Sequence, residues 1–503
     1  MKNKKTIAIT LMALSIVAAG CGKGSDSSTG STSSPAPTVD NTPLKLTIMA
    51  NLSTPEVPSD KLEKLLEQKT NSDITFQWVP DGSYDEKFQA ALATGSLPQA
   101  VNLKNQSSFV LLRQTLKDGQ FWEIGPYLKD YPNLKNLNPE VLENTKVMGK
   151  IYSLYQERPI ARQGIIYRKD WADKLGLAEP KTTDDIYNML KKFKEANLGG
   201  GKTIPLADRN DLIYGSFKTL SAYFGTPNGW GVVDGKLVPE FMTQGYMDTM
   251  NFIKKLRTEG LINQDFPVTS KTDQQNLMYT GASGMYVGSM QDVQTLQQKT
   301  EANNKTAVYD VVNQITSANQ KTASTWGIPG YGTLVVFPKS AVKTEAELKK
   351  ILAFYDKFFS PEVANLLKYG VENEHYKMVE GKVQPVTDAK LLEKEQKAYL
   401  TVALADTTNI LPTYYNLKTQ EKAVQLSNDA VKFAVQNPTN SLDSKTYTEK
   451  GAILQDIIKD ATYKYMVGDI DAAGFQKLVD KWKNDGGNKI IEEYNASYKE
   501  VKK

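Results

Sequence analysis

The residue types that most often do chemistry in proteins are scarce in this chain. Its 503 residues include one cysteine, Cys21, and one histidine, His375. One cysteine excludes an intrachain disulfide, and the pair together cannot supply a Cys/His metal site. A Ser-His-Asp arrangement could use only His375, which we expect to be structural, and no serine lies in a G-x-S-x-G turn. We therefore predict no catalytic residue, no metal and no cofactor.

The position of Cys21 indicates what its thiol does. Three lysines among the first five residues precede an uncharged, mostly apolar run over 6–19. This pattern is typical of a secretory signal, and the run is too short to span a bilayer comfortably. The residues Ala18-Ala19-Gly20-Cys21 resemble a bacterial lipobox, although Ala18 stands where leucine is usual. The resemblance implies a signal peptide over 1–20 and lipidation of Cys21; the alternative is an ordinary signal with an incidental cysteine.

The segment after Cys21 is rich in Ser, Thr, Gly and Pro up to residue 43 and has almost no large apolar side chain. Such a composition cannot bury a core, so we predict a flexible tether over 21–43 with a mean reach of roughly 25 Å. Together with a lipidated cysteine it predicts a protein anchored on the extracellular face of the cell membrane.

Arginine is rare and clustered. The chain has six arginines against 55 lysines, and Arg158, Arg162 and Arg168 lie within eleven residues. The planar guanidinium suits fixed, bidentate hydrogen bonds, whereas lysine serves as a mobile surface charge. We interpret Arg168 as an anchor for the helix that follows it. We predict that Arg158 and Arg162 contact a ligand.

The elements that would position a site begin with an alternation of strands and helices. Apolar patterns predict strands over 44–50, 74–79 and 99–103, with helices between them. This βαβαβ order implies a parallel sheet with right-handed crossovers, whose ligands lie beyond the carboxyl ends of the strands. From this rule we predict the ligand contacts Asn51, Ser53, Asn102 and Lys104.

Aromatic residues in Gly/Pro-rich or extended stretches complete the candidate site. Aromatic rings cover the apolar faces of a sugar, and amides, carboxylates and arginines pair with its hydroxyls. On this basis we select Tyr223, Trp230, Trp326 and Tyr331. Each of them could equally belong to a hydrophobic core.

Charge and length limit the class of protein. The net charge is +4, but removal of residues 1–20 leaves 58 basic against 57 acidic side chains. A nearly neutral body gives no electrostatic basis for binding nucleic acid. The remaining length is sufficient for two large domains.

Several segments, in order, resemble one known family. They are GKIYSL, YRKDWADKLGL, EGLINQDF, GMYVGS, YGVENEHYK and GGNKIIEEYN. The chain is similar to the extracellular solute-binding lipoproteins, family 1, of carbohydrate ABC importers in Gram-positive bacteria. The resemblance covers nearly all of residues 44–498.

The resemblance implies an α/β, two-lobe periplasmic-binding-protein-like fold of type II, with lobes joined by hinge strands. The expected ranges are 44–155 and 335–400 for the first lobe, 165–330 and 410–503 for the second, and 156–164, 331–334 and 401–409 for the hinge crossings. It also implies a monomer that binds a carbohydrate, as an oligosaccharide, and passes it to ABC transporter permease subunits.

Some relatives in this family carry an acidic calcium loop after the helix equivalent to 184–196. Here that loop, 197–202, has no carboxylate, and calcium needs six to eight oxygens, several of them from carboxylates. We therefore predict no calcium at this loop.

Two other functional classes remain open from the sequence. A glycoside hydrolase would need two carboxylates flanking the scissile bond, and among 57 acidic residues none stands out. A surface lectin would bind the same ligands without a transporter.

Overall fold

The computed structural model describes residues 42–104 and 106–501. Cys21, the signal and nearly all of the tether lie outside these residues. The elements described below belong to the unit that begins at Pro43. No helix within the described residues is long and apolar enough to cross a membrane.

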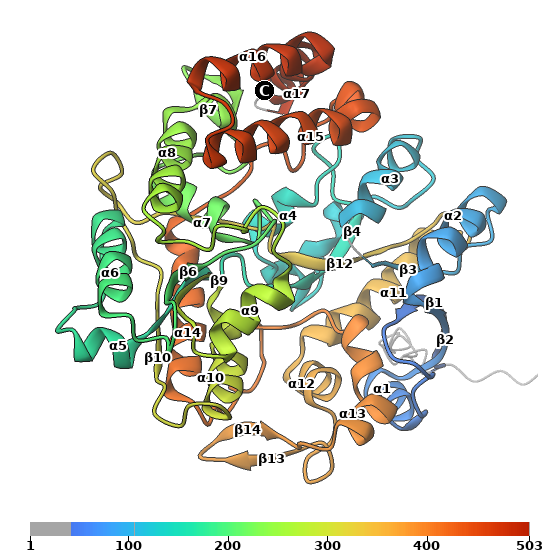
Figure 1. Ribbon diagram of the computed structural model, residues 1–503. Helices are drawn as coiled ribbons and strands as arrows, with labels where there is room; N and C mark the ends of the chain where they lie inside the picture. Colours follow the sequence, from blue (N-terminus) through green and yellow to red (C-terminus); the bar gives the residue numbers. More distant parts are fainter. Residues whose placement is uncertain (1–41, 105, 502–503) are drawn as a thin grey trace, which may run out of the picture. The chain divides into compact units, whose positions relative to one another are not determined.

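The first lobe is built on a five-stranded sheet of order β2-β1-β3-β12-β4 (Figure 1). Strand β1 pairs in parallel with β2 and β3, which confirms the predicted βαβαβ start, whereas β12 runs antiparallel to β3 and β4. Its elements are β1 (Leu44–Leu52), α1 (Lys61–Thr70), β2 (Ser72–Pro80), α2 (Tyr84–Thr94), β3 (Ala100–Leu103), α3 (Gln106–Lys117), α4 (Pro139–Asn144), β4 (Ser153–Glu157), β12 (Tyr331–Val336), α11 (Glu345–Asp356), α12 (Pro361–Tyr369), β13 (Tyr376–Val379), β14 (Lys382–Pro385) and α13 (Ala389–Glu395).

The second lobe is built on a four-stranded sheet of order β10-β5-β9-β6, with β9 antiparallel to β5 and parallel to β6. Its elements are β5 (Gln163–Arg168), α5 (Lys169–Lys174), α6 (Thr183–Ala196), β6 (Ile204–Ala207), α7 (Ser216–Tyr223), β7 (Trp230–Val233), β8 (Lys236–Pro239), α8 (Gln244–Thr258), α9 (Lys271–Tyr279), β9 (Ser283–Ser289), α10 (Val293–Glu301), β10 (Tyr309–Val312), β11 (Thr325–Trp326), α14 (Lys418–Asp429), β15 (Ala434–Val435), α15 (Lys445–Val467), α16 (Ala472–Trp482) and α17 (Asn488–Val501). The C-terminal part of this lobe, from α15 to α17, is helical.

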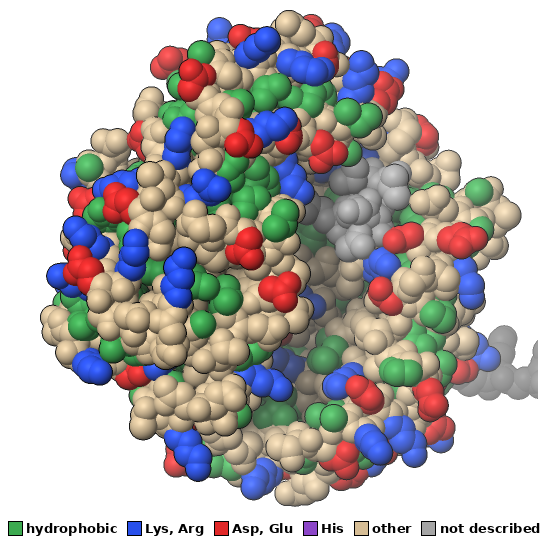
Figure 2. All heavy atoms as spheres, in the orientation of Figure 1, with side chains coloured by type: hydrophobic (Ala, Val, Ile, Leu, Met, Phe, Trp, Pro, Cys, Tyr) green, Lys and Arg blue, Asp and Glu red, His purple; other side chains and the backbone are tan. Residues whose placement is uncertain are grey.

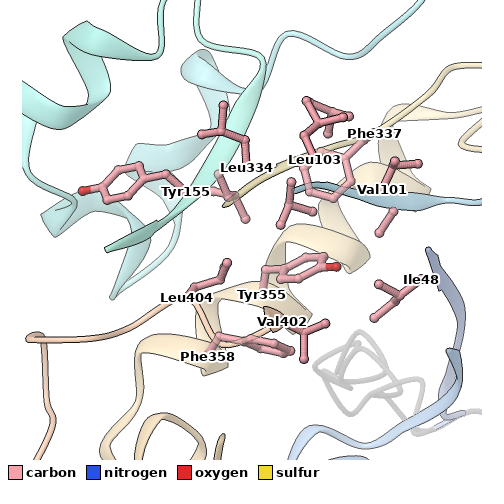
Figure 3. Packing of buried hydrophobic residues seen from close by; sticks show 14 of the residues in the cluster. Ile48, Val101, Leu103, Tyr155, Leu334, Phe337, Tyr355, Phe358, Val402 and Leu404 are labelled. Carbon is pink, nitrogen blue, oxygen red and sulfur yellow. The ribbon is translucent and has the colours of Figure 1, made fainter. Parts of the chain in front are cut away.

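Each sheet has its own hydrophobic core. One core takes its buried residues from 46–160 and 331–405, and the largest core of the second lobe takes them from 165–315 and 442–494. The first core contains Tyr155 of β4, Leu334 of β12, Tyr355 of α11 and Leu404, which Figure 3 shows from close by. Two separate cores on two sheets make the two-lobe α/β architecture that the sequence predicted.

The chain passes from β4 of the first sheet to β5 of the second over 158–162, and from β11, which pairs with β15, to β12 of the first sheet over 327–330. It reaches α14 from the segment after Thr401. We propose that these passages act as the hinge; the predicted crossing 331–334 lies within β12, directly after the second passage.

Arg168 fixes the junction between β5 and α5, as interpreted from the sequence. The side chain is 1% exposed, and its Nε and Nη2 atoms donate to the Asp170 carboxylate at 2.8 and 2.6 Å. Its guanidinium carbon lies 4.5 Å from the ring centroid of Trp171. A buried guanidinium needs such a bidentate partner, because an unpaired buried charge is very costly.

Candidate ligand-binding cleft

The carboxyl ends of β1, β2 and β3 carry a hydrogen-bonded cluster of polar side chains. Asn51 Nδ2 donates to Asp81 Oδ1 at 3.1 Å, and Lys104 Nζ donates to the Asp81 carbonyl oxygen at 2.8 Å. Asn102 is 1% exposed, and its Nδ2 donates to the carbonyl oxygen of Thr401 at 3.2 Å. The structure thus places Asn51, Asn102 and Lys104 at one edge of the sheet. Asp81 and Thr401 connect them, and the sequence analysis selected neither.

This edge contains buried acceptors without donors. The side-chain oxygens of Asn51 and Asn102 are buried and accept no hydrogen bond from any residue that the structure describes. Ser53, also predicted as a contact, is exposed immediately after β1. Buried polar atoms are almost always hydrogen-bonded in folded proteins. These two oxygens are therefore polar groups that the described residues leave unpaired.

The first crossing presents alternate side chains to opposite sides. Gln156 Nε2 donates to the carbonyl oxygens of Leu400 and Ala403 at 2.7 and 2.9 Å, while its buried Oε1 has no partner among the described residues. The Gln156 Oε1 and Arg158 Nε atoms both lie within 3 Å of where a Cβ on Gly332 would be. Gln156 and Arg158 therefore share one side of the crossing, as the two-residue period of a strand requires.

Glu157 faces the other side and binds the third crossing. Its carboxylate accepts the backbone N–H groups of Asp406, Thr407 and Thr408 at 2.8, 2.8 and 2.9 Å, and the hydroxyls of both threonines. Burial alone would raise the pKa of Glu157, but these hydrogen bonds, led by the Thr408 hydroxyl, lower it below its usual range. Glu157 thus holds the first and third crossings together.

The facing edge of the second lobe carries Arg162 and Gln163. The carbonyl oxygen of Arg162 accepts the Met290 N–H at 3.0 Å, and Gln163 pairs with Ser289 on β9. The Arg162 side chain is exposed, while Gln163 is 3% exposed and its Oε1 has no partner within the described part of the chain. This lobe therefore repeats the combination of an exposed guanidinium and a buried, unpaired amide oxygen.

The end of β6 is a part of the site that the sequence analysis missed. Asp208 follows β6 and accepts both the N–H and the hydroxyl of Ser216, at the start of α7. Burial nevertheless raises the pKa of Asp208 above its usual range. Arg209 Nη1 donates to Gln274 Oε1 at 2.9 Å, and Arg209 Nη2 donates to the Tyr214 carbonyl oxygen at 2.6 Å. The strand-end rule, applied to this sheet as well, would have selected this segment.

The predicted aromatic residues separate into two groups. Trp326 donates from Nε1 to Thr219 Oγ1 at 3.2 Å, and its ring centroid lies 5.8 Å from that of Tyr214, an exposed ring that the sequence analysis did not select. Tyr331, where β12 begins, is 7% exposed and belongs to the first core, and Trp230 is 8% exposed and belongs to the second. Tyr223, in contrast, is 0% exposed inside the second core. We leave it out of the proposed site, because a buried core ring offers no surface to a ligand.

Amide side chains lie against backbone glycines between the lobes. Asn228 Nδ2 donates to the carbonyl oxygens of Gly327 and Val435 at 2.6 and 2.9 Å. Both amide atoms of Gln436 are buried without a described partner, and Nε2 lies 2.7 Å from where a Gly327 Cβ would be. A side chain at this glycine would displace the amide. The arrangement keeps polar amide groups close to the crossing backbone.

A cavity of about 860 Å³ is lined by α3, by the loop 210–213 and by 437–459. Trp230 is the one predicted site residue in its lining, and the strand-end and crossing residues described above are not part of it. Figure 2 shows a hollow between the side that carries α9 and the side that carries α1 and α2, with Lys and Arg side chains in blue within it. Such a concave, mixed polar and aromatic surface suits a small ligand.

One contact joins the lobes beside this cavity. Arg113 of α3 donates from Nη1 to the Leu442 carbonyl oxygen at 2.7 Å and from Nη2 to the Asn440 carbonyl oxygen. Asp443 accepts from Arg113 at 3.3 Å and pairs with Lys117 at 2.9 Å. Helix α3 packs on the first sheet, whereas Leu442 belongs to the second core. The lobes are therefore connected by hydrogen bonds as well as by the crossings.

His375 lies away from the groups described above and is fully buried. Its Nδ1 accepts the Val371 N–H at 3.0 Å, so the ring proton is on Nε2, which faces Glu395 Oε2 at 3.2 Å. Gly370 has φ +82°, and a Cβ there would lie 2.6 Å from His375 Nδ1. This arrangement accounts for the YGVENEHY motif by packing, in agreement with the structural role expected for His375.

We expect calcium to leave the melting temperature unchanged. The loop after α6 is closed by neutral groups, because Thr203 N donates to Asn197 Oδ1 at 2.9 Å and Gly199 N donates to Thr203 Oγ1 at 2.9 Å. Calcium ligation depends on several carboxylate oxygens. A thermal melt with and without millimolar calcium measures the effect, and magnesium is the control. A saturable shift with calcium alone would contradict the prediction.

The chain is similar to several characterised proteins. A family described as "Bacterial extracellular solute-binding protein" matches residues 55–365. The polygalacturonan/rhamnogalacturonan-binding protein YtcQ of Bacillus subtilis is 41% identical over 509 residues, covering 100% of both chains. The lipoprotein LipO of the same organism is 36% identical, covering 99% of each chain.

A solved structure shares the fold at low sequence identity. It is an HMO-binding, ABC-transporter-associated solute-binding protein from Bifidobacterium longum infantis. The TM-score is 0.71 at 17% identity, over 92% of this chain and 99% of that one. At this identity the similarity concerns the fold alone.

Proposed function

Because the chain belongs to the bacterial extracellular solute-binding proteins, we propose that it captures an oligosaccharide between its lobes and delivers it to an ABC importer. The observation that supports this most is the set of buried, unpaired amide oxygens at facing lobe edges, in Asn51, Asn102, Gln156 and Gln163. Sugar hydroxyls are donors that can satisfy them, and lobe closure would exclude water around the ligand.

The ligand class follows from the relative with 41% identity, which is named for binding polygalacturonan and rhamnogalacturonan. That identity extends over the entire chain, so both lobes of the cleft are included. We propose that pectin-type oligosaccharides are the ligands, and that the ring pair of Trp326 and Tyr214 covers the apolar face of one sugar.

We further propose that the protein is anchored through Cys21. The signal pattern, the tether over 21–43 and the similarity to a protein named as a lipoprotein support this proposal. A diacylated cysteine would hold the body at the extracellular membrane face, because two acyl chains give stable attachment. Cys21→Ser should release the protein into the medium.

We propose that the protein binds its ligand without altering it. Asp81 and Glu157, carboxylates at the cleft, are held by hydrogen bonds from Asn51 and Lys104 and from the segment 406–408. A glycoside hydrolase remains the alternative enzyme, and a reducing-sugar assay separates it from a binding protein. Deletion of the gene for this protein separates an importer's binding protein from a lectin. Growth on the oligosaccharide should be impaired if the protein serves an importer and unchanged if it is a lectin.

We expect Tyr214→Ala to weaken oligosaccharide binding about 5- to 20-fold, because stacking on an exposed ring is lost without a change in the core. Isothermal titration with galacturonan and rhamnogalacturonan fragments measures the effect. Tyr187→Ala, on the remote helix α6, is the matched control. Unchanged affinity in Tyr214→Ala would remove this ring from the site, and release of reducing ends by the wild-type protein would contradict the proposed function.

A further inference from the structure

Two arginines of the cleft have no partner for their charge. Of the six arginines, Arg113, Arg168, Arg209 and Arg257 each donate a side-chain hydrogen bond to another residue. Within residues 42–104 and 106–501, the Arg158 and Arg162 side chains make no hydrogen bond or ion pair, and both are exposed. Both lie within the crossing between β4 and β5, Arg158 directly after β4 and Arg162 directly before β5.

The carboxylates near these arginines are already occupied. Glu157, the neighbour of Arg158, points to the opposite side and accepts three backbone N–H groups from the segment 406–408. Asp406 pairs with Lys368 at 3.1 Å, and Asp292, near the Arg162 edge, accepts the Tyr286 hydroxyl at 2.8 Å. The positive charge of both guanidiniums therefore remains available to a ligand.

The Arg158 guanidinium has a buried amide oxygen as its neighbour. Arg158 Nε and Gln156 Oε1 approach the same point above Gly332, and this Oε1 has no partner among the described residues. A guanidinium binds a carboxylate with two parallel N–H donors, and an amide oxygen accepts a hydroxyl proton. A uronic acid carries both groups on one ring, whereas a neutral sugar leaves the guanidinium unpaired.

We propose that Arg158 and Arg162 are the specificity-determining residues for carboxylate-bearing sugars, with Gln156 accepting a hydroxyl beside Arg158. This inference rests on the proposed function. The ligand is then an oligosaccharide with at least two free uronate groups, one bound by Arg158 and the other by Arg162. Methyl-esterified or neutral chains of the same length lack the group that the arginines recognise.

The test compares matched ligands and matched variants by isothermal titration. De-esterified oligogalacturonide should bind the wild-type protein, and its fully methyl-esterified form of the same length should bind about 10- to 100-fold more weakly. Arg158→Gln and Arg162→Gln should each weaken binding of the acidic ligand by a similar factor and leave the affinity for the methyl ester unchanged. Arg158→Lys keeps the positive charge but loses the two parallel N–H donors of the guanidinium. Its affinity for the acidic ligand should lie between those of the wild-type protein and Arg158→Gln.

Lys191→Gln on the remote helix α6 removes the same charge and should leave both affinities unchanged. Equal affinity for the two ester forms, or equal weakening of both by the arginine variants, would overturn the inference. Tight binding of a neutral oligosaccharide alone would also overturn it while leaving the proposed function intact. If no oligosaccharide binds at all, the proposed function itself fails.

Discussion

Asp170→Ala is expected to destabilise the protein by about 3–5 kcal/mol, because it leaves the Arg168 guanidinium buried without a counter-charge. Arg168 is 1% exposed and has its two carboxylate bonds at 2.8 and 2.6 Å. The guanidinium also stacks on Trp171, so the loss should reach the packing between β5 and α5. Urea denaturation followed by circular dichroism gives the change in unfolding free energy.

Two comparisons separate this effect from simple loss of a surface charge. Asp173→Ala removes an exposed pair with Lys169 on the same helix and should cost less than about 0.5 kcal/mol. The double variant Arg168→Met with Asp170→Ala should be more stable than Asp170→Ala alone, because no unpaired charge then remains. A double variant that is less stable than the single one would show that the ion pair is not what matters.

Glu157→Gln is expected to destabilise the protein by about 2–3 kcal/mol, because charge-assisted hydrogen bonds to three N–H groups are replaced by weaker neutral ones. The hydrogen bonds lower the folded-state pKa of Glu157. Since that pKa lies below the unfolded value of about 4.3, the stabilisation is complete above this pH. It is lost as the pH falls through the folded-state pKa.

The pH dependence gives this prediction a second readout. Thermal melts between pH 3 and 7 should show that the wild-type protein loses its advantage over Glu157→Gln as the solution becomes acidic. Glu86→Gln, an exposed carboxylate on α2, should keep the wild-type profile. A constant difference between Glu157→Gln and wild type across this range would mean that the carboxylate charge contributes nothing to holding the crossings together.

The sequence was informative wherever a short segment determines its own structure. The strand and helix alternation over 44–103 predicted a parallel sheet. The polar residues at its strand ends do share one edge, because Asn51 and Lys104 both donate hydrogen bonds to Asp81. Arg168 could be interpreted because its partner lies two residues away. Local patterns contain the information for such contacts.

The missed residues depend on contacts between distant parts of the chain. Thr401 reaches Asn51 across 350 positions, and Gln156 reaches Ala403 across 247. Nothing near Thr401 in the sequence indicates that it lies beside the first strand. Tyr223 and Tyr214 occupy similar polar and aromatic surroundings in the sequence, yet Tyr223 lies in the buried helix α7, whereas Tyr214 precedes this helix and is exposed.

The contact between Arg113 and the segment 440–443 bears on how quickly a captured molecule leaves. Separation of the lobes at this end must first break the hydrogen bonds to Asn440 and Leu442 and the pairing with Asp443. Those bonds add to the activation barrier for opening. Residence time on the protein is then set partly by contacts between the lobes, and it shortens as rising ionic strength weakens the pairing with Asp443.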